Sequence, residues 1–251
     1  MTSIILPHRR KAFQPAGGTY VGVQPDIGVI CNDGSGTAVA VELPGGASDL
    51  TADADEWLTI PTRYNCNEAQ SIETTAGQFN SILDNLTDQL TIFCRCSHPS
   101  SWNVSSRTIA QYGPSAGAHL PLAFRFEVDK NNTNGQYRMA LDYTIATSTG
   151  TVLAQVDYGA DAQSGEHSVA MVYDGTDVQF YLDGSTHGSA QSLTGDFDSP
   201  ASAGKILVLG SQLTGALMHT GFWDGGIRDW RLALTALSAA EISTWDANPA
   251  T

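Results

Sequence analysis

A chain of 251 residues is long enough to bury one sizeable core, and all-β sandwiches of this length are often single domains. The formal net charge of -14 excludes a general nucleic-acid binder, because neutralising phosphates requires Lys and Arg. No run of about 20 apolar residues occurs, so the sequence predicts no membrane insertion.

The first 26 residues are predicted to form a basic arm, and residues 27–251 the folded domain. Arg9, Arg10 and Lys11 are the only charged residues among the first 25, which carry +3; the rest have 9 basic and 26 acidic side chains and carry -17. Such an arm is either a docking element or a disordered terminus. The basic cluster follows the apolar run IILP instead of preceding it, so we expect no signal peptide and folding in a cytoplasm.

Short strands separated by turns follow along the chain. IGVIC and TAVAVEL flank NDGSG and predict a hairpin, and PGGASDLTADAD reads as a loop. Further strands are expected at EWLTIP, at Leu90–Cys96 after a short helix, at RTIAQYG, at LAFRFEVD, and at the pair YRMALDYTIA and TVLAQVDY.

The C-terminal part has the clearest pattern. Val169, Met171 and Tyr173 share one face of a strand, Val178, Phe180 and Leu182 share one face of the next, and Asp174-Gly175-Thr176 joins the two. Trp230, Leu232 and Leu234 share a face that Ile227 has the wrong parity to join, which predicts a β-bulge near Arg228–Asp229. Ser238 and Glu241 form a capping box that starts a helix, with Leu237 and Ile242 as a hydrophobic staple.

Three blocks resemble a laminin-G-like (concanavalin-A-like) domain in the family's order. They are DADEWLTIP, LTDQLTIFCRCSHPSSWNVSSRTIAQYG, and HSVAMVYDGTDVQFYLDGSTHG through RLALTALSAAEI, which together span about residues 50–246. The resemblance implies an all-β, two-sheet antiparallel jelly-roll sandwich, and the late capping box adds one short C-terminal helix.

The catalytic strand of glucan-hydrolysing relatives has no counterpart here. Those enzymes use E-x-D-x-E or E-x-D-x-x-E, so that two carboxylates flank the scissile bond. The similar segment here begins with Glu127 and Asp129, but Asn131 and Asn132 occupy both possible third positions, and an amide cannot serve as the acid. We therefore expect no catalytic residues and no enzyme activity.

Two other short motifs are interpreted as structural. GPSAG at 113–117 matches G-x-S-x-G but lacks the strand-to-helix context of a nucleophile elbow. Cys94, Cys96 and His98 do not have zinc-site spacing, and the two thiols are expected to point into the core from one strand face. With Cys31 and Cys66, we expect four free thiols.

The resemblance implies two binding chemistries. Family members often hold Ca²⁺ at the sandwich edge, and Asp229 matches by motif position, with Asp53 and Asp55 as neighbours; the alternative is solvated or turn-forming Asp. Aromatic and polar side chains near predicted loops could form a glycan-binding platform, or could pack in the core or at a sheet edge. The candidates are Trp102, Asn103, Arg107, Tyr112 and Trp223.

The leading functional hypothesis is a non-enzymatic virion protein. IILPHRRKAFQP resembles the basic, Pro-containing start of tailed-phage virion proteins that bear such jelly rolls. The hypothesis is a capsid decoration or fibre protein, made in the host cytoplasm, whose sandwich binds host-surface glycan. Its arm would anchor it to capsid or other virion proteins through Arg9, Arg10, Lys11 and Phe13. The alternatives are a purely structural, homo-oligomerising virion protein, a carbohydrate-active enzyme, and a cellular lectin or adhesin.

Overall fold

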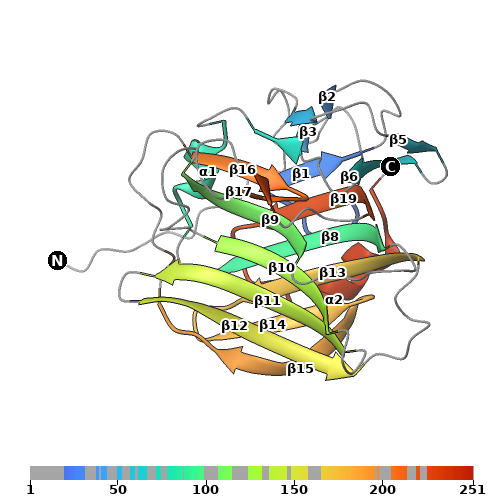
Figure 1. Ribbon diagram of the computed structural model, residues 1–251. Coiled ribbons are helices and arrows are strands. Elements are labelled where there is room, and N and C mark those ends of the chain that lie inside the picture. The colour runs from blue at the N-terminus through green and yellow to red at the C-terminus, as the bar shows by residue number, and fades with distance from the viewer. Residues whose placement is uncertain are drawn as a thin grey trace.

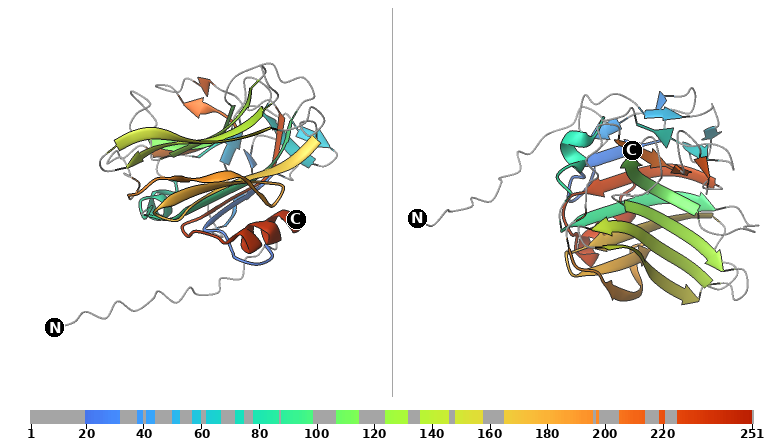
Figure 2. Two further views of the ribbon diagram at one scale, coloured as in Figure 1. Left: turned by 90° about the horizontal axis from the view of Figure 1, so that it is seen from below. Right: turned by 60° about the vertical axis from the view of Figure 1, so that its left-hand side comes forward.

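The fold is an antiparallel two-sheet sandwich with one short helix on its outside (Figures 1 and 2). This agrees with the fold class predicted from the sequence. The computed structural model describes residues 20–31, 38–39, 41–43, 50–52, 57–59, 62–66, 72–74, 78–86, 88–98, 107–114, 124–131, 136–145, 148–157, 165–195, 197, 205–213, 219–220 and 225–250.

The larger sheet has nine strands within the described residues. They are β1 (Ile27–Ile30), β3 (Val41–Leu43), β5 (Trp57–Thr59), β6 (Thr62–Cys66), β8 (Leu90–His98), β13 (Gly165–Tyr173), β14 (Asp177–Leu182), β15 (Ser185–Ser192) and β19 (Gly225–Ala233). Their order is β15-β14-β13-β8-β19-β1-β3, with β6 paired to β19 and β5 paired to β6.

The second sheet has eight strands in the described part of the chain. They are β2 (Ala38–Val39), β4 (Leu50–Ala52), β7 (Ile72–Glu73), β9 (Arg107–Pro114), β10 (Phe124–Asn131), β11 (Gln136–Ile145), β12 (Ser148–Asp157) and β16 (Lys205–Leu209). Their order is β12-β11-β10-β9-β16-β7-β4-β2. The remaining elements are the pair β17 (Gln212–Leu213) and β18 (His219–Thr220), and the helices α1 (Asn80–Leu83) and α2 (Ala239–Ala247).

Two segments differ from the sequence expectation. The expected hairpin after residue 27 is divided between the sheets, because β3 pairs with β1 while β2 pairs with β4. The expected loop at PGGASDLTADAD contains β4, which also pairs with β7. A two- or three-residue strand gives almost no periodic pattern, so only its hydrogen-bonded partners reveal it.

The main core lies between the sheets and is built by side-chain alternation. The predicted inward sets of β13 and β14 are all buried in one cluster with Phe124 and Phe126 of β10. Across the sandwich, the Phe126 and Phe180 rings stack at 6.1 Å. Each such buried aromatic ring stabilises the fold by about 2–3 kcal/mol.

The predicted bulge lies in β19. The pairing with β8 shifts between Ile227 and Asp229, and this shift brings Ile227 onto the core face with Trp230 and Leu232. One additional residue changes the parity of the strand, so apolar residues of mismatched spacing reach the same side.

Helix α2 adds a third layer on the outer face of the nine-stranded sheet (Figure 2). Its N-terminus has the predicted capping box: the Ser238 side chain accepts from the Glu241 N–H, and the Glu241 side chain accepts from the Ser238 N–H. Leu237 and Ile242 are both buried in the second apolar cluster, as the staple predicts. Trp245 packs edge-on to Phe93 of β8 at 5.9 Å.

The described part of the chain before β1 packs against the C-terminal elements. The Trp245 indole N–H donates to the Val23 carbonyl at 2.8 Å, and the Asp26 carboxylate accepts from the Leu234 N–H at 2.7 Å. Tyr20 is buried against Gly28, where a Cβ would lie 2.3 Å from the Tyr20 hydroxyl oxygen. Residues 20–26 of the expected arm are therefore packed on the domain.

Candidate functional site

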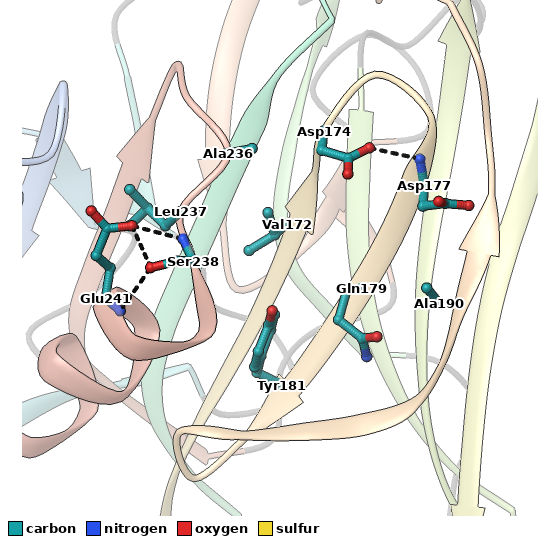
Figure 3. Close-up of a pocket in the computed structure, with 10 residues that line it drawn as sticks. All are labelled: Val172, Asp174, Asp177, Gln179, Tyr181, Ala190, Ala236, Leu237, Ser238 and Glu241. Atoms are coloured by element: carbon teal, nitrogen blue, oxygen red, sulfur yellow. Dashed lines mark hydrogen bonds between the residues drawn. The ribbon is translucent and has the colours of Figure 1, made fainter.

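A pocket of about 370 Å³ opens on the outer face of the nine-stranded sheet, beside the start of α2 (Figure 3). Its size lies within the range of small-ligand sites. Strands β13, β14 and β15 form one side, and the segment leading into α2 forms the other. The lining residues are Val172, Asp174, Asp177, Gln179, Tyr181, Ala190, Ala236, Leu237, Ser238 and Glu241.

Strand alternation places the β14 side chains of the pocket. Because Val178, Phe180 and Leu182 enter the core, Asp177, Gln179 and Tyr181 must face outward. The sequence pattern predicts the inward set correctly, but it gives no sign that the outward set lines a pocket, because the opposite wall comes from the segment leading into α2.

The hairpin turn fixes Asp174 at the rim of the pocket. Its Oδ1 accepts from the Thr176 N–H at 2.9 Å and from the Asp177 N–H at 2.8 Å. These backbone hydrogen bonds lower the pKa of Asp174, so it is ionised at neutral pH. Gly175 allows the turn with a φ of 94°.

The phenol of Tyr181 is the most buried polar group in the pocket. Tyr181 is 6% exposed, and its hydroxyl points toward the other lining side chains (Figure 3). Burial raises its pKa, so the hydroxyl keeps its proton. Among the described residues, nothing hydrogen-bonds to this hydroxyl, and its oxygen is not fully buried, so water or a ligand in the pocket can reach it.

The other polar groups present acceptor oxygens. The Gln179 Nε2 donates to the carbonyls of Phe180 at 2.9 Å and Gly188 at 3.2 Å, which leaves Oε1 as the presented end of the amide. Asp177 uses Oδ1 for the Ser192 hydroxyl, and Glu241 uses Oε2 for the cap.

The electrostatic character of the pocket follows from these contacts. Asp174, Asp177 and Glu241 are all carboxylates, and the described residues of the lining include no Lys, Arg or His. Hydrogen bonds from the Ser238 backbone and side chain lower the pKa of Glu241. The apolar floor of Val172, Leu237 and the two alanines therefore has an acceptor-rich, negative rim.

A separate group of polar side chains lies on β9 and β10 of the other sheet. Glu127 is buried and ion-paired with Arg125, whose Nε lies 3.0 Å from Glu127 Oε1. The Thr108 hydroxyl lies 3.5 Å from the same oxygen. Glu127, the first carboxylate of the glycosidase-like segment, therefore lies in an ion pair.

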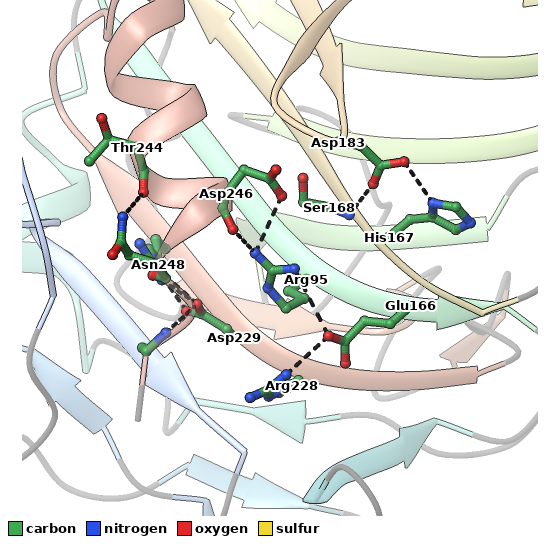
Figure 4. A network of polar contacts seen from close by, with 12 residues as sticks. Arg95, Glu166, His167, Ser168, Asp183, Arg228, Asp229, Thr244, Asp246 and Asn248 are labelled. Atoms are coloured by element: carbon green, nitrogen blue, oxygen red, sulfur yellow. Dashed lines mark hydrogen bonds and ion pairs between the residues drawn. The ribbon is translucent and has the colours of Figure 1, made fainter. Parts of the chain in front are cut away.

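A network of ion pairs connects α2 to the sheet beneath it (Figure 4). Arg95 of β8 lies 3.3 Å from Asp246 of α2 and 3.9 Å from Glu166 of β13, and Glu166 also accepts from Arg228 at 3.0 Å. This network joins three strands to the helix, and we assign it a structural role.

Asp229, the residue expected to bind calcium, lies in a buried ion pair. It is fully buried, and its oxygens lie 2.9 and 3.1 Å from the Arg231 Nε. It also accepts from the Ala250 N–H at 3.1 Å. A cation at this carboxylate would have to displace the Arg231 guanidinium, which is itself fully buried.

Tyr112 is also placed in a structural role. Instead of lying at a loop surface it is 1% exposed, and its hydroxyl lies within 3.3 Å of Asn80 and Asp84 at α1. Its ring faces the core cluster and is covered by protein. It therefore offers no face on which a sugar could stack.

The remaining predicted site residues lie outside the described side chains. The backbone of Arg107 begins β9, and nothing further is described of it. The others are Trp102, Asn103 and Trp223 of the platform, Asp53 and Asp55 of the calcium site, and Arg9, Arg10, Lys11 and Phe13 of the anchor.

The cysteines behave as core residues. Cys94 and Cys96 are fully buried on one face of β8, as predicted, and both are free thiols, as is Cys31. Burial raises the pKa of Cys94, which makes it unreactive. In the described ranges, no group of three or more His, Cys, Asp or Glu side chains is placed to hold a metal.

Neither helix in the described part of the chain has the length or apolar composition needed to cross a bilayer.

Comparisons with known proteins identify the superfamily of the sandwich. The family model described as "Concanavalin A-like lectin/glucanases superfamily", a laminin G-type model, matches residues 72–243. No curated protein matches the sequence.

Solved structures with a similar fold include several from carbohydrate-active proteins. Domain 4 of AbnA, a GH43 extracellular arabinanase from Geobacillus stearothermophilus in complex with arabinotriose, has a TM-score of 0.57 at 11% identity, covering 89% of this chain and 98% of that chain. The CBM40 of the Ruminococcus gnavus IT-sialidase, bound to α2,3 sialyllactose, has a TM-score of 0.56 at 14% identity, covering 72% of this chain and 94% of that chain. The Trypanosoma rangeli sialidase has a TM-score of 0.53 at 13% identity, and the match covers 88% of this chain and 32% of the sialidase. At these identities the likeness is one of fold.

Proposed function

This chain belongs to the concanavalin A-like lectin/glucanase superfamily, and from that premise we propose that it is a non-enzymatic module that binds glycan in the pocket beside α2. The observation that carries the proposal is the pocket's composition: an apolar floor beside a buried phenol, an amide oxygen and carboxylates. Sugars present apolar C–H faces together with many hydroxyl donors, and such a surface matches both.

Two solved neighbours support the proposal by analogy. One is an arabinanase domain in complex with arabinotriose, and the other is a sialidase CBM40 bound to sialyllactose. Both are matched over nearly their whole length, so the likeness in fold covers most of each neighbour. The analogy is one of fold, and the site must be argued from the pocket itself.

The absence of catalysis is part of the same proposal. Hydrolysis of a glycosidic bond needs two carboxyl groups placed on either side of it. Glu127 is ion-paired with Arg125, and the positions where the family motif would place a third acidic residue are Asn131 and Asn132. Because Arg231 holds the Asp229 carboxylate, a calcium site would be built on Asp53 and Asp55.

Glycan binding is tested by filling the pocket. Ala190 lines the pocket from β15, and Ala190→Trp would occupy it with an indole ring. On a glycan array, we expect the wild-type chain to bind and Ala190→Trp to lose at least about tenfold in affinity. Ser185→Trp is the matched control, because Ser185 is exposed on the same strand outside the pocket and should keep full binding.

Two results would contradict the proposal. Silence of the wild-type chain on a broad array would favour the purely structural alternative. Turnover of any polysaccharide, lost in Glu127→Gln, would make the protein an enzyme.

We also propose that the module is displayed on a phage particle, as a capsid decoration or fibre protein. This finer proposal is supported by the resemblance of IILPHRRKAFQP to virion-protein starts and by the +3 charge ahead of an acidic body. Deleting residues 1–13 should abolish attachment to particles while the sandwich remains folded. Unchanged attachment of the truncated chain, measured by mass spectrometry of purified particles, would contradict the anchor. Many displayed copies would raise a weak single-site affinity through avidity.

A further inference from the structure

The lining of the pocket contains an imbalance between hydrogen-bond acceptors and donors. Within the described residues, the oxygens without a hydrogen bond are Asp174 Oδ2, Asp177 Oδ2, Glu241 Oε1 and Gln179 Oε1. The one side-chain donor without a partner is the Tyr181 hydroxyl, which can also accept. A ligand that satisfies this pocket must bring mainly donors.

Charge restricts the ligand further. Hydrogen bonds hold Asp174 and Glu241 in their ionised forms, and none of the lining residues that the structure describes is a cation that could offset them. An acidic sugar would place its carboxylate against three others without a positive partner, and such like-charge contacts are unfavourable. A protonated amine would instead gain an ion pair and up to three donated hydrogen bonds.

Tyr181 distinguishes this pocket from an ordinary acidic patch. Carboxylates alone commonly form a solvated surface, but here they surround a tyrosine that is 6% exposed and whose hydroxyl has no hydrogen-bond partner among the described residues. The ring packs in the apolar cluster beneath α2, so the hydroxyl is held in place in the pocket. A sugar hydroxyl bound there would exchange hydrogen bonds with it in place of water.

Resting on the glycan-binding function proposed above, we propose that the pocket selects saccharides that carry a free amino group, binds neutral saccharides more weakly and rejects acidic ones. This specificity is opposite in charge to that of the sialic-acid-bearing ligand named for one of the structural neighbours. The likeness in fold therefore does not extend to the ligand.

The test compares matched oligosaccharides by calorimetry with the full chain. Glucosamine oligomers differ from N-acetylglucosamine oligomers only at the amine, and sialyllactose supplies the acidic case. We expect roughly tenfold tighter binding of the amino form than of the acetylated form, as two or three partly exposed ion pairs would give. The difference should disappear at about 1 M NaCl, where charges are screened over roughly 3 Å.

Two variants assign the preference to this pocket. Tyr181→Phe removes only the hydroxyl, and should weaken all binding about fivefold to tenfold without loss of stability. Asp177→Asn should reduce the ratio of the affinities for the amino and the acetylated oligomers, because it removes one of the three carboxylates. Tyr112→Phe and Asp84→Asn are the controls. Each makes the same chemical change outside the pocket: Tyr112 lies on β9, and Asp84 lies at the end of α1.

The outcomes separate this inference from the proposed function. Tight binding of sialyllactose would overturn the inference and leave glycan binding intact. If both Tyr181→Phe and Asp177→Asn keep the full preference for the amino form, the binding site lies elsewhere and the inference is also overturned. Binding of a Lys- and Arg-rich peptide without binding of any saccharide would overturn both.

Discussion

At the scale of single residues, the most consequential side chain is Arg231. It is fully buried, it holds Asp229, and it lies over the rings of Tyr20, Phe93 and Trp245 at 4.9, 5.2 and 5.4 Å. A buried cation keeps its charge only when it is paired and surrounded by groups that replace its hydration. The pair therefore fixes the interface between the sheet and the last turns of the chain, where Asn248 and Ala250 also contact it.

Breaking this pair from one side should be costly. We expect Asp229→Ala to lower the free energy of unfolding by about 3–5 kcal/mol, because it leaves Arg231 charged and buried without a counterion. Urea denaturation measures the loss. Asp229→Leu combined with Arg231→Met should recover much of it, and Arg228→Met, in a partly exposed pair, should cost less than about 1 kcal/mol. Equal losses of unfolding free energy in Asp229→Ala and Arg228→Met would contradict this account.

A second residue-scale prediction concerns pH. The hydrogen bond between His167 Nδ1 and Asp183 at 2.8 Å raises the pKa of His167. A His pKa that is higher in the folded state stabilises the fold below the unfolded value of about 6.5, and this stability is lost as the pH rises through the folded value. For Asp183, burial raises the pKa, but the hydrogen bonds from His167 and the Ser168 N–H outweigh burial and lower it overall. Its contribution therefore persists until the pH falls below about 4.

The difference in unfolding free energy between wild type and His167→Gln should thus be largest near pH 5 and smallest above about pH 8. Thermal or urea unfolding across this range measures it, and a difference independent of pH would contradict the assignment. Gln191→Ala, which changes a polar side chain at the exposed end of β15, is a control without titration.

At the scale of elements, the bulge in β19 decides which residues of that strand enter the core. Arg228 is the additional residue, and its carbonyl accepts from the Cys31 N–H at 2.8 Å, so the bulge also connects β19 to the end of β1. Gly225, with φ of 156°, and the buried Gly226 begin the strand, and the Gly226 N–H is held by the Ser97 hydroxyl at 2.9 Å.

Deleting Arg228 should keep Ile227 in the core. The deletion leaves Ile227 two positions before Trp230, so regular alternation places both on the core face without a bulge. The deletion also removes the carbonyl that accepts from the Cys31 N–H and the ion pair with Glu166, so we expect a loss of about 1–3 kcal/mol with the fold retained, whereas Arg228→Met should remain close to wild type. Circular dichroism with urea unfolding measures both variants, and a deletion variant that fails to fold would show that the bulge does more than correct the parity.

At the scale of the whole molecule, the two ends of the described chain hold one another. Residues 20–26 contact the segment after β19 and helix α2. The hydrogen bond from Trp245 to Val23 joins residues that are 222 positions apart in the sequence. Helix α2 has nine residues and would not be stable alone, so its packing on the sheet and on this segment maintains it.

Truncation tests this arrangement. A chain that starts at residue 14 keeps Tyr20, Val23 and Asp26, and we expect its unfolding free energy to match that of the full chain. A chain that starts at residue 27 loses all three contacts and should be less stable by roughly 3 kcal/mol or more. Equal stability of the two truncated chains, measured in urea, would show that residues 20–26 do not contribute to the fold.

Local patterns in the sequence determined much of the fold. Period-two alternation predicted the inward faces of β13 and β14, parity predicted the bulge in β19, and the Ser238 and Glu241 pair predicted the start of α2. Each of these depends on residues a few positions apart, whose geometry follows from strand pleating or from a helix turn. The strand β4 was missed because three residues are too few to show a period.

Only the tertiary structure decided the candidate site. It brings Tyr181 of β14 beside Ser238 and Glu241 of the segment entering α2, and it pairs the buried Asp229 with Arg231. It also buries Tyr112, which the sequence placed near a loop. A sequence specifies which side of a strand a residue faces, but the neighbour across that face comes from a distant part of the chain. The hydrogen bonds, burial and charge that define a binding site depend on that neighbour.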